Sequence, residues 1–193
     1  LQHLYFELEG EHKVNTQSIV TGHDDQGCSC VIYAGPLLGN ESFTYQPGFS
    51  AAIFGQTSAE PMVGSNVTSR LLPITNVLPC VAGTTALMVT FPPVLAEEAQ
   101  KNIAPEDIAN ELEERLPGFA QVFDPDAPGF HRTDTIDYAV LIAGELTLLL
   151  DNGESAHLKA GDVIVQNGTR HAWLNTSNSP ARMMFVMVGA TRV

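Results

Sequence analysis

The chain has 193 residues, enough to bury one well-packed core, and with 44% hydrophobic and 16% charged residues its composition excludes general disorder. Its 22 acidic residues against nine basic ones give a net charge of −13, which repels nucleic acid phosphates and anionic lipid surfaces. Because the sequence also lacks a run of about 18 apolar residues, we predict neither a nucleic acid partner nor a membrane partner.

The first residues are set apart from the predicted domain. The opening LQHLYFELEG lacks the charged and apolar regions of a secretory signal peptide, and residues 1–13 are predicted to be a tag remnant or a disordered start. Cys28, Cys30 and Cys80 form neither a disulfide framework nor a metal-finger spacing. Reduced thiols are typical of a cytoplasmic protein, which is the location we predict.

The middle of the chain predicts strands followed by one helix. Residues 14–95 contain short apolar runs separated by turn residues, as in CSCVIYAGPLLGN, FSAAIFG and TTALMVTFPPV, which predict short strands and extended arms. A helix is predicted near 105–116, where a proline begins the segment and Ile108, Leu112 and Leu116 recur at four-residue steps. A Pro-Gly pair then ends it.

The C-terminal third predicts an antiparallel all-β barrel or sandwich. Short apolar segments recur there at the spacing typical of such folds, at residues 135–144, 145–151, 155–161, 162–166, 171–177 and 181–190. Asn152-Gly153 is a strong hairpin signal between two of these segments, and Asn167-Gly168 marks a second turn.

Two groups of residues in these segments resemble the two motifs of the cupin superfamily. The first motif of that family runs Gly, a few residues, His-x-His, three or four residues, Glu, six residues, Gly; its positions hold Gly129, His131, Thr133, Asp137 and Gly144. The second runs Gly-Asp, a short strand, a Pro/Gly turn, His, three residues, Asn, and is matched by Gly161, Asp162, Gly168, His171 and Asn175. The chain is most similar to a subgroup of small single-domain cupins from bacteria and fungi.

The resemblance implies a fold and a partner. The implied fold is a single antiparallel cupin barrel, or jelly roll, over residues 14–193, with core motifs at 129–189, N-terminal strands or arms, and the one short helix. A homodimer is also implied, because cupins commonly pair through added strands. Some fungal members of the subgroup lie in secondary-metabolite gene clusters, so the resemblance implies a role in secondary metabolism.

Alternation along a strand gives an independent reason to place the motif side chains in one pocket. Every second residue of a strand shares a face, so His131 and Asp137 face the core if Leu141 does. His171 and Trp173 are in phase with each other on the second segment. Buried polar groups must bond each other, a ligand or a metal. We therefore predict His131, Asp137 and His171 as catalytic residues.

The sequence does not decide between a metal-bound and a metal-free site, because this chain departs from the family pattern. Thr133 takes the place of the second histidine, and Asp137 that of the longer glutamate. His131, Asp137 and His171 could together bind one Fe or Zn ion, since two imidazoles and one carboxylate are a known donor set for Fe(II) and suit Zn²⁺ with a water. The alternative is a metal-free site.

The predicted substrate is a small, largely apolar organic molecule, contacted by Thr133, Trp173, Asn175 and Met184. The predicted reaction is lyase or isomerase chemistry, such as dehydration, double-bond migration or cyclisation. One histidine would be the base and the other the acid, with Asp137 orienting or charge-stabilising an imidazole. Two alternatives are a non-haem Fe(II) oxygenase or oxidoreductase, and a non-catalytic cupin that binds a small molecule.

Overall fold

The computed structural model describes residues 16–64, 74–94 and 103–193, so the predicted tag or disordered start at 1–13 lies outside the described residues. The strands are β1 (Gln17–His23), β2 (Ser29–Pro36), β3 (Ser50–Thr57), β4 (Thr84–Phe91), β5 (Thr135–Ala143), β6 (Glu145–Leu149), β7 (Ser155–Lys159), β8 (Val163–Asn167), β9 (Ala172–Leu174) and β10 (Ala181–Gly189). The helical elements are α2 (Pro105–Arg115) and the short 3-10 turns η1 (Ala120–Val122) and η2 (Asp151–Gly153).

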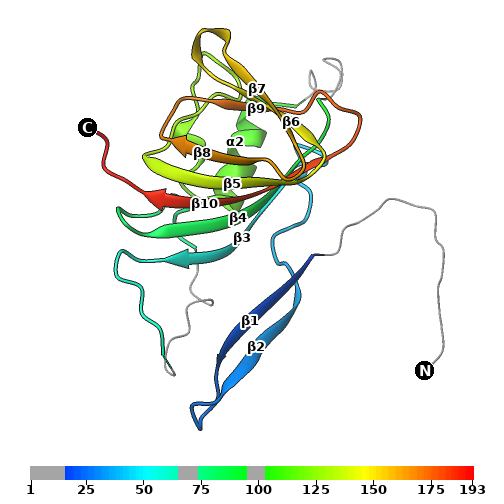
Figure 1. Cartoon of the computed structure of the whole chain (residues 1–193). Helices are drawn as coiled ribbons and strands as arrows, with labels where there is room; N and C mark the ends of the chain where they lie inside the picture. The colour runs from blue at the N-terminus through cyan, green and yellow to red at the C-terminus, as the bar shows by residue number, and fades with distance from the viewer. Residues whose placement is uncertain (1–15, 65–73, 95–102) are drawn as a thin grey trace, which may run out of the picture.

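Two antiparallel sheets form the barrel. A five-stranded sheet has the order β3-β4-β10-β5-β8, and a three-stranded sheet has the order β7-β6-β9. In Figure 1 the five strands lie one above another in front of α2, and β6, β7 and β9 close the upper part of the barrel. Over the described residues this is the predicted all-β cupin jelly roll with one short helix.

Alternation of side chains builds the core between the sheets. Along β10, successive residues alternate between buried and partly exposed from end to end. The buried set meets the inward residues of β5 and β6, so that Leu141, Leu146 and Met183 are almost completely inaccessible to water. A strand side chain points to the face opposite that of its neighbour, which is why a strictly alternating sequence gives one apolar face to the interior.

Tight turns hold the strand pairs in register. Asn152 and Gly153 both have positive φ, at 58° and 77°, in the turn between β6 and β7. That backbone twist matches the twist of an antiparallel hairpin and is tolerated best by asparagine and glycine. The Asn-Gly turn predicted from the sequence is therefore confirmed.

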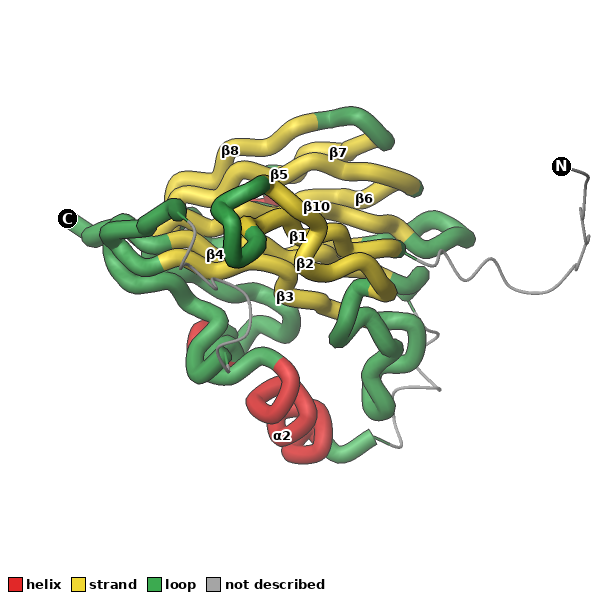
Figure 2. Tube along the Cα trace, turned by 90° about the horizontal axis from the view of Figure 1, so that it is seen from below, coloured by secondary structure: helices red, strands yellow, loops and turns green. Residues whose placement is uncertain are grey.

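Helix α2 is fixed beside the barrel by its own charged residues. The Glu111 carboxylate accepts hydrogen bonds from the backbone N–H groups of Thr44 and Tyr45, at 2.6 and 2.8 Å. The Arg115 guanidinium donates to backbone carbonyls of the same loop, including that of Glu41 at 2.7 Å. Seen from below in Figure 2, the helix lies outside the strands on the side of β3. Within the described residues no helix is long and apolar enough to cross a membrane.

Strands β1 and β2 form an arm that stands apart from the barrel. They pair only with each other, as a two-stranded antiparallel sheet. Figure 1 shows this arm extending beyond the β3 edge of the five-stranded sheet. The prediction of N-terminal strands and arms is confirmed for this segment.

Candidate active site

Two histidines meet where the chain before β5 runs alongside the start of β9. The backbone N–H of His131 donates to the carbonyl of His171 at 2.9 Å, and the reverse hydrogen bond is 3.0 Å long. This reciprocal pair makes the residues direct neighbours across an antiparallel bridge. Their imidazole centroids lie 4.2 Å apart, at an interplanar angle of 56°. The predicted meeting of the two imidazoles is what the structure shows.

Backbone carbonyls set the orientation and tautomer of both rings. Nδ1 of His131 lies 3.2 Å from the carbonyl of Gly129, and Nδ1 of His171 lies 2.9 Å from that of Thr169. A carbonyl oxygen only accepts, so each Nδ1 carries the proton and each Nε2 has a free lone pair when the ring is neutral. Burial, and then the neighbouring His131, lower the pKa of His171 to about 4. Burial also lowers the pKa of His131, so both rings are neutral at pH 7.

Asp137 is the buried acid of the site. Its side chain is only 6% exposed, and its Oδ1 has no hydrogen-bond partner in the described structure. Burial raises the pKa of Asp137 to about 6, although a hydrogen bond from Thr135 opposes the rise. Thr135 is in turn 2.7 Å from the hydroxyl of Thr133. The three side chains share one face of the strand and form a buried polar row.

This row bears on the role predicted for Asp137, which was to orient or charge-stabilise a histidine. The hydrogen bond to its carboxylate comes from Thr135, while the carbonyls of Gly129 and Thr169 orient the two imidazoles. Because the carboxyl group is not bonded to either ring, it can exchange a proton with a ligand directly.

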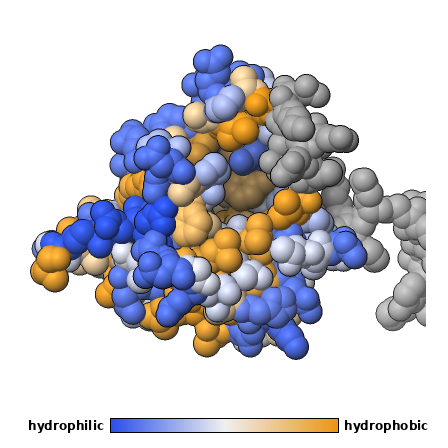
Figure 3. All heavy atoms as spheres, turned by 90° about the horizontal axis from the view of Figure 1, so that it is seen from above, coloured by the Kyte–Doolittle hydropathy of each residue, from blue (hydrophilic) through white to orange (hydrophobic). Residues whose placement is uncertain are grey.

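An apolar cavity of about 350 Å³ opens onto these polar groups. Figure 3 shows an opening in the surface with hydrophobic residues in its depth. Its polar wall contains His131, Thr133, Asp137 and His171. The aromatic residues that line the rest are Phe49, Phe91, Phe119, Phe123, Trp173 and Phe185. A cavity of this size and polarity is typical of a small-molecule site.

Two predicted contact residues do not reach the cavity. Asn175 is buried, but its amide nitrogen donates to the carbonyls of Phe91 and Ser179, both at 2.9 Å, and its oxygen accepts from Ser177. It ties the loop after β9 to β4, and its polar atoms are occupied. Met184 lies in the outward phase of β10, while the cavity is lined by Phe185 and Met187. Thr133 and Trp173 do line the cavity.

Several wall residues were not anticipated from the sequence. Met187 could have been found by applying to β10 the same alternation that places Asp137 inside. Helix α2 contributes Ile108 and Leu112, and Leu116 follows directly after it; this apolar face was recognised in the sequence but not assigned to the pocket. Gln166 is not among the residues that line the cavity, but it is buried opposite Asp137 on the neighbouring strand, and its Nε2 has no partner in the described structure.

The donor set does not fit a resident metal ion of the kind that the cupin family implies. Among residues 16–64, 74–94 and 103–193, no group of three or more His, Cys, Asp or Glu side chains is arranged to hold one. Thr133 stands at one of the family's ligand positions. Asp137, the remaining carboxylate, is bonded to Thr135. The combined site of His131, Asp137 and His171 expected as an alternative is thus not formed in the described structure.

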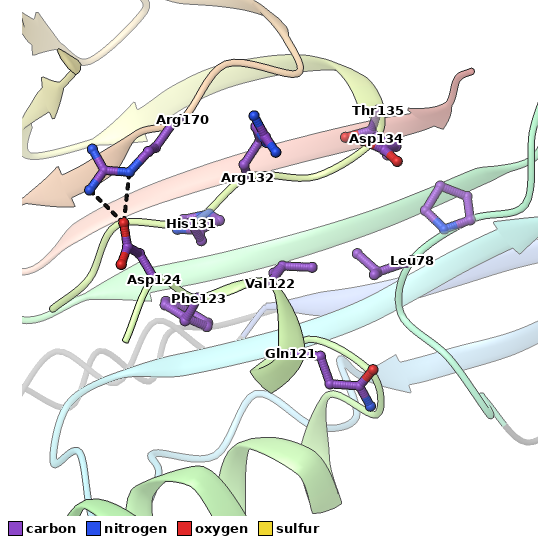
Figure 4. Close-up of a pocket in the computed structure, with 11 residues that line it drawn as sticks. Leu78, Gln121, Val122, Phe123, Asp124, His131, Arg132, Asp134, Thr135 and Arg170 are labelled. Carbon is purple, nitrogen blue, oxygen red and sulfur yellow. Dashed lines mark hydrogen bonds and ion pairs between the residues drawn. The ribbon is translucent and has the colours of Figure 1, made fainter. Parts of the chain in front are cut away.

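A second, more polar cavity lies on the other side of His131. It has a volume of about 540 Å³ and shares His131 and Phe123 with the apolar cavity. Figure 4 shows the Asp124–Arg170 ion pair at one end and Asp134 with Thr135 at the other. The Asp124 carboxylate accepts from two guanidinium nitrogens of Arg170, at 3.0 and 2.7 Å. His131 therefore forms part of the wall between an apolar and a charged compartment.

We predict that Asp137→Asn stabilises the fold at alkaline pH. The carboxyl has an ordinary pKa of 3.8 and a folded pKa of about 6, so its contribution to stability is fully present below 3.8 and is lost as pH rises through 6. Removing the ionisable group should raise the free energy of unfolding by about 3 kcal/mol at pH 8, and by little near pH 4. Urea unfolding at both pH values measures this. The control Asp134→Asn, an exposed residue paired with Arg192, should bring no gain; an Asp137→Asn protein no more stable than wild type at pH 8 would contradict the prediction.

We predict that Met187, and not Met184, contacts a ligand in the apolar cavity. Trp173 is the only tryptophan in the sequence and lines this cavity, so its fluorescence reports on occupancy. Titration with 4-nitrobenzyl alcohol, an aromatic ring with one hydroxyl, should quench it saturably. Met187→Ala should weaken binding about tenfold through lost apolar contact, whereas Met184→Ala should leave it unchanged. A larger effect from Met184→Ala would refute the assignment of the two faces of β10.

Comparison with known proteins identifies the fold family. The family model described as "Cupin domain" matches residues 121–187. Phomopsin biosynthesis cluster protein D of Diaporthe leptostromiformis is 54% identical over 61 residues, which cover 31% of this chain and 32% of that protein. Oryzines biosynthesis cluster protein J of Aspergillus oryzae is 37% identical over 110 residues, covering 54% and 62%. The cupin-domain-containing oxidoreductase virC of Hypocrea virens is 38% identical over 94 residues, covering 47% and 46%.

This chain thus spans less than two thirds of the length of each of these relatives. The match to the family model, residues 121–187, contains both motifs and the paired histidines. Residues 121–187 of this antiparallel barrel thus match the cupin domain, over about a third of the chain.

Proposed function

We propose that the chain is an enzyme that moves a proton on a small, largely apolar organic molecule with one polar end. The observation that carries this proposal is a buried carboxyl group with a pKa of about 6 and a free oxygen, at the polar end of an aromatic cavity. A general acid or base works best when its pKa lies near the working pH. Asp137 meets that condition, while His171, with a pKa of about 4, is a weaker base.

In this mechanism Asp137 takes and returns the proton. Its carboxylate removes a proton from an activated carbon of the substrate, and the resulting carboxylic acid delivers a proton to another atom, after exchange with water where water reaches the site. The Nε2 lone pairs of His131 and His171 accept hydrogen bonds from a substrate hydroxyl and position it. No co-reactant other than water is needed, because the substrate loses one proton and gains one.

This arrangement supports isomerase chemistry over dehydration. Loss of water requires a proton donor for the departing hydroxyl at the moment when the base is taking a proton. Both imidazoles are neutral at pH 7, and their only N–H groups point to backbone carbonyls, so neither supplies that second proton. Double-bond migration, or a cyclisation that needs one proton shuttle, fits the site better.

The names of the relatives support a biological role for the proposed enzyme. Two of them are named as proteins of biosynthesis clusters, which supports a role for this chain in secondary metabolism. Others are named cupin-domain-containing oxidoreductases, which makes an oxidoreductase the second candidate. A cytoplasmic location and a homodimer also belong to the proposal; the free cysteines Cys28, Cys30 and Cys80 are compatible with the first. A collapsed, non-catalytic site is disfavoured by the cavity volume.

We predict that the wild-type chain catalyses hydrogen–deuterium exchange at the benzylic carbon of phenylacetone, a carbon acid small enough for the cavity. Asp137→Asn should abolish the exchange, and His131→Ala and His171→Ala should each reduce it at least tenfold. Because the carboxylate is the base, the rate should fall about tenfold per pH unit below pH 6 and level off above it. Proton NMR in D₂O follows the exchange, with circular dichroism to check each fold. Full activity of both histidine variants would eliminate the assignment.

We predict that the purified chain carries no stoichiometric metal and needs none, because Thr133 replaces a ligand position and the donors do not form a group. Elemental analysis should find metal well below one ion per chain. Zn²⁺ or Fe²⁺ should not raise the melting temperature. A metal site would instead add about 2.7 kcal/mol to the free energy of unfolding when the free metal concentration is 100 times its Kd. Stoichiometric iron together with oxygen consumption would favour the oxidoreductase instead.

A further inference from the structure

One threonine belongs to the wall of the polar cavity and contacts the acid of the apolar cavity. Thr135 lines the polar cavity, where Figure 4 shows it beside Asp134, and Asp137 lines the apolar cavity. The two residues follow each other on the inward face of β5, and Thr135 donates a hydrogen bond to the Asp137 carboxylate. Thr135 therefore connects the polar cavity with the carboxylate that is proposed to move a proton.

The other inward neighbours of Asp137 offer no path for a proton. Ala139 follows it on the same face of β5, and Met187 is its partner on β10; neither side chain has an exchangeable proton. Gln166, its partner on β8, is buried, but it lines neither cavity, and its amide does not take part in acid–base exchange near neutral pH. Among these neighbours, Thr135 is the one that has a hydroxyl and also lines the polar cavity.

His131 lines both cavities, but its hydrogen bonds do not join them. Its Nδ1 carries the proton and donates to the carbonyl of Gly129, 3.2 Å away. An imidazole relays a proton only when one ring nitrogen takes it up while the other releases its own, and a backbone carbonyl cannot carry the released proton away. The carboxylate of Asp137 is bonded to Thr135, and its other oxygen has no partner in the described structure. The path through Thr135 is therefore favoured over one through the ring.

A second hydroxyl orients Thr135 and leaves room for a water. Oγ1 of Thr133 lies 2.7 Å from Oγ1 of Thr135, and both residues are buried. A hydroxyl donates one hydrogen bond and accepts two, so Thr135 can donate to Asp137, accept from Thr133 and accept from one further donor. The polar cavity, whose walls carry two aspartates and two arginines, is polar and large enough to supply water as that donor.

We propose that Thr135 relays protons between water in the polar cavity and the carboxyl group of Asp137. This inference rests on the proposed proton transfer at Asp137 and adds the route by which that proton exchanges with solvent. After Asp137 has taken a proton from the substrate, it passes this proton to Oγ1 of Thr135, whose own proton passes to a water. The reverse movement brings a solvent proton to Asp137. Each transfer breaks one O–H bond and forms another, so no oxidant or reductant takes part.

The route matters because a bound substrate covers the other side of Asp137. The apolar cavity is lined mostly by aromatic and aliphatic side chains, so a ligand that fills it displaces water from the carboxylate. Without the relay, the proton that Asp137 takes up can only return to the bound substrate. With the relay, a solvent proton replaces it while the substrate stays in place. The share of solvent protons in the product therefore reports on Thr135 separately from the reaction rate.

Isomerisation of 3-cyclohexen-1-one to 2-cyclohexen-1-one in D₂O tests the proposal, because this reaction removes a proton from the α-carbon and delivers one to the γ-carbon. Absorbance of the conjugated product gives the rate, and NMR at low conversion gives the deuterium fraction at the γ-carbon. Wild type should carry deuterium there in about half of the product molecules or more. Thr135→Val should lower this fraction at least fivefold and the rate by less, and Thr135→Ser, which keeps the hydroxyl, should restore it.

Thr85→Val is the matched control, because it removes a buried threonine hydroxyl of the barrel interior that lines neither cavity. It should keep the deuterium fraction of wild type. Circular dichroism and thermal melting check that each variant is folded. If Thr135→Val does not fold, Thr135→Ala removes the same hydroxyl with a smaller side chain and should give the same loss of deuterium.

The outcomes separate the relay from the proposed function. A wild type that does not isomerise the ketone overturns both the proton transfer at Asp137 and the relay. A wild type that isomerises it, with an unchanged deuterium fraction in Thr135→Val, overturns the relay alone. A loss of deuterium in Thr85→Val as large as that in Thr135→Val also overturns the relay, because the effect would then belong to any buried hydroxyl.

Discussion

The reciprocal backbone hydrogen bonds between His131 and His171 are the constraint on which the site depends. They join the segment before β5 to the start of β9, and so tie a strand of the large sheet to the small one. The same bridge places two imidazoles 4.2 Å apart at the end of the aromatic cavity. If the pairing slipped by one residue, both rings would turn to the other face of their strands. The same backbone hydrogen bonds therefore link the two sheets and position the two imidazoles.

Burial then shifts the pKa values of the ionisable groups that lie near this bridge. Removing water disfavours charge, so the pKa of Asp137 rises to about 6 while that of His171 falls to about 4. At pH 7 the site holds a carboxylate that is easily protonated next to two uncharged rings. Thr135 donates a hydrogen bond to this carboxylate but leaves one oxygen open. A single proton carrier in an apolar cavity is the result, which is why the site suits a proton shuttle better than a pair of acid and base.

Residue alternation explains how much could be read from the sequence. It correctly placed His131, Asp137 and His171 in one interior, and the Asn-Gly turn fixed a hairpin. The sequence prediction did not apply alternation to β10. It chose Met184 as a contact residue, although Met187 has the inward phase. It also cannot show what a buried polar group bonds: Asn175 is inside, but its partners are backbone carbonyls of Phe91 and Ser179. The aromatic walls come from segments far apart in the chain, whose meeting no local pattern reports.

The alternation that builds the cavity also builds the surface behind it. Asp137 faces inward and Tyr138 outward, and on the next strand Gln166 faces inward and Val165 outward. A sheet with water on its outer side would carry polar residues at Tyr138 and Val165, as antiparallel sheets commonly do. Here both phases are largely apolar, with polar groups concentrated at the inner site. A sheet that is apolar on both faces is stable in water only if both are covered. The core covers the inner face, whereas Tyr138, Val163 and Val165 on the outer face stay exposed in the described structure.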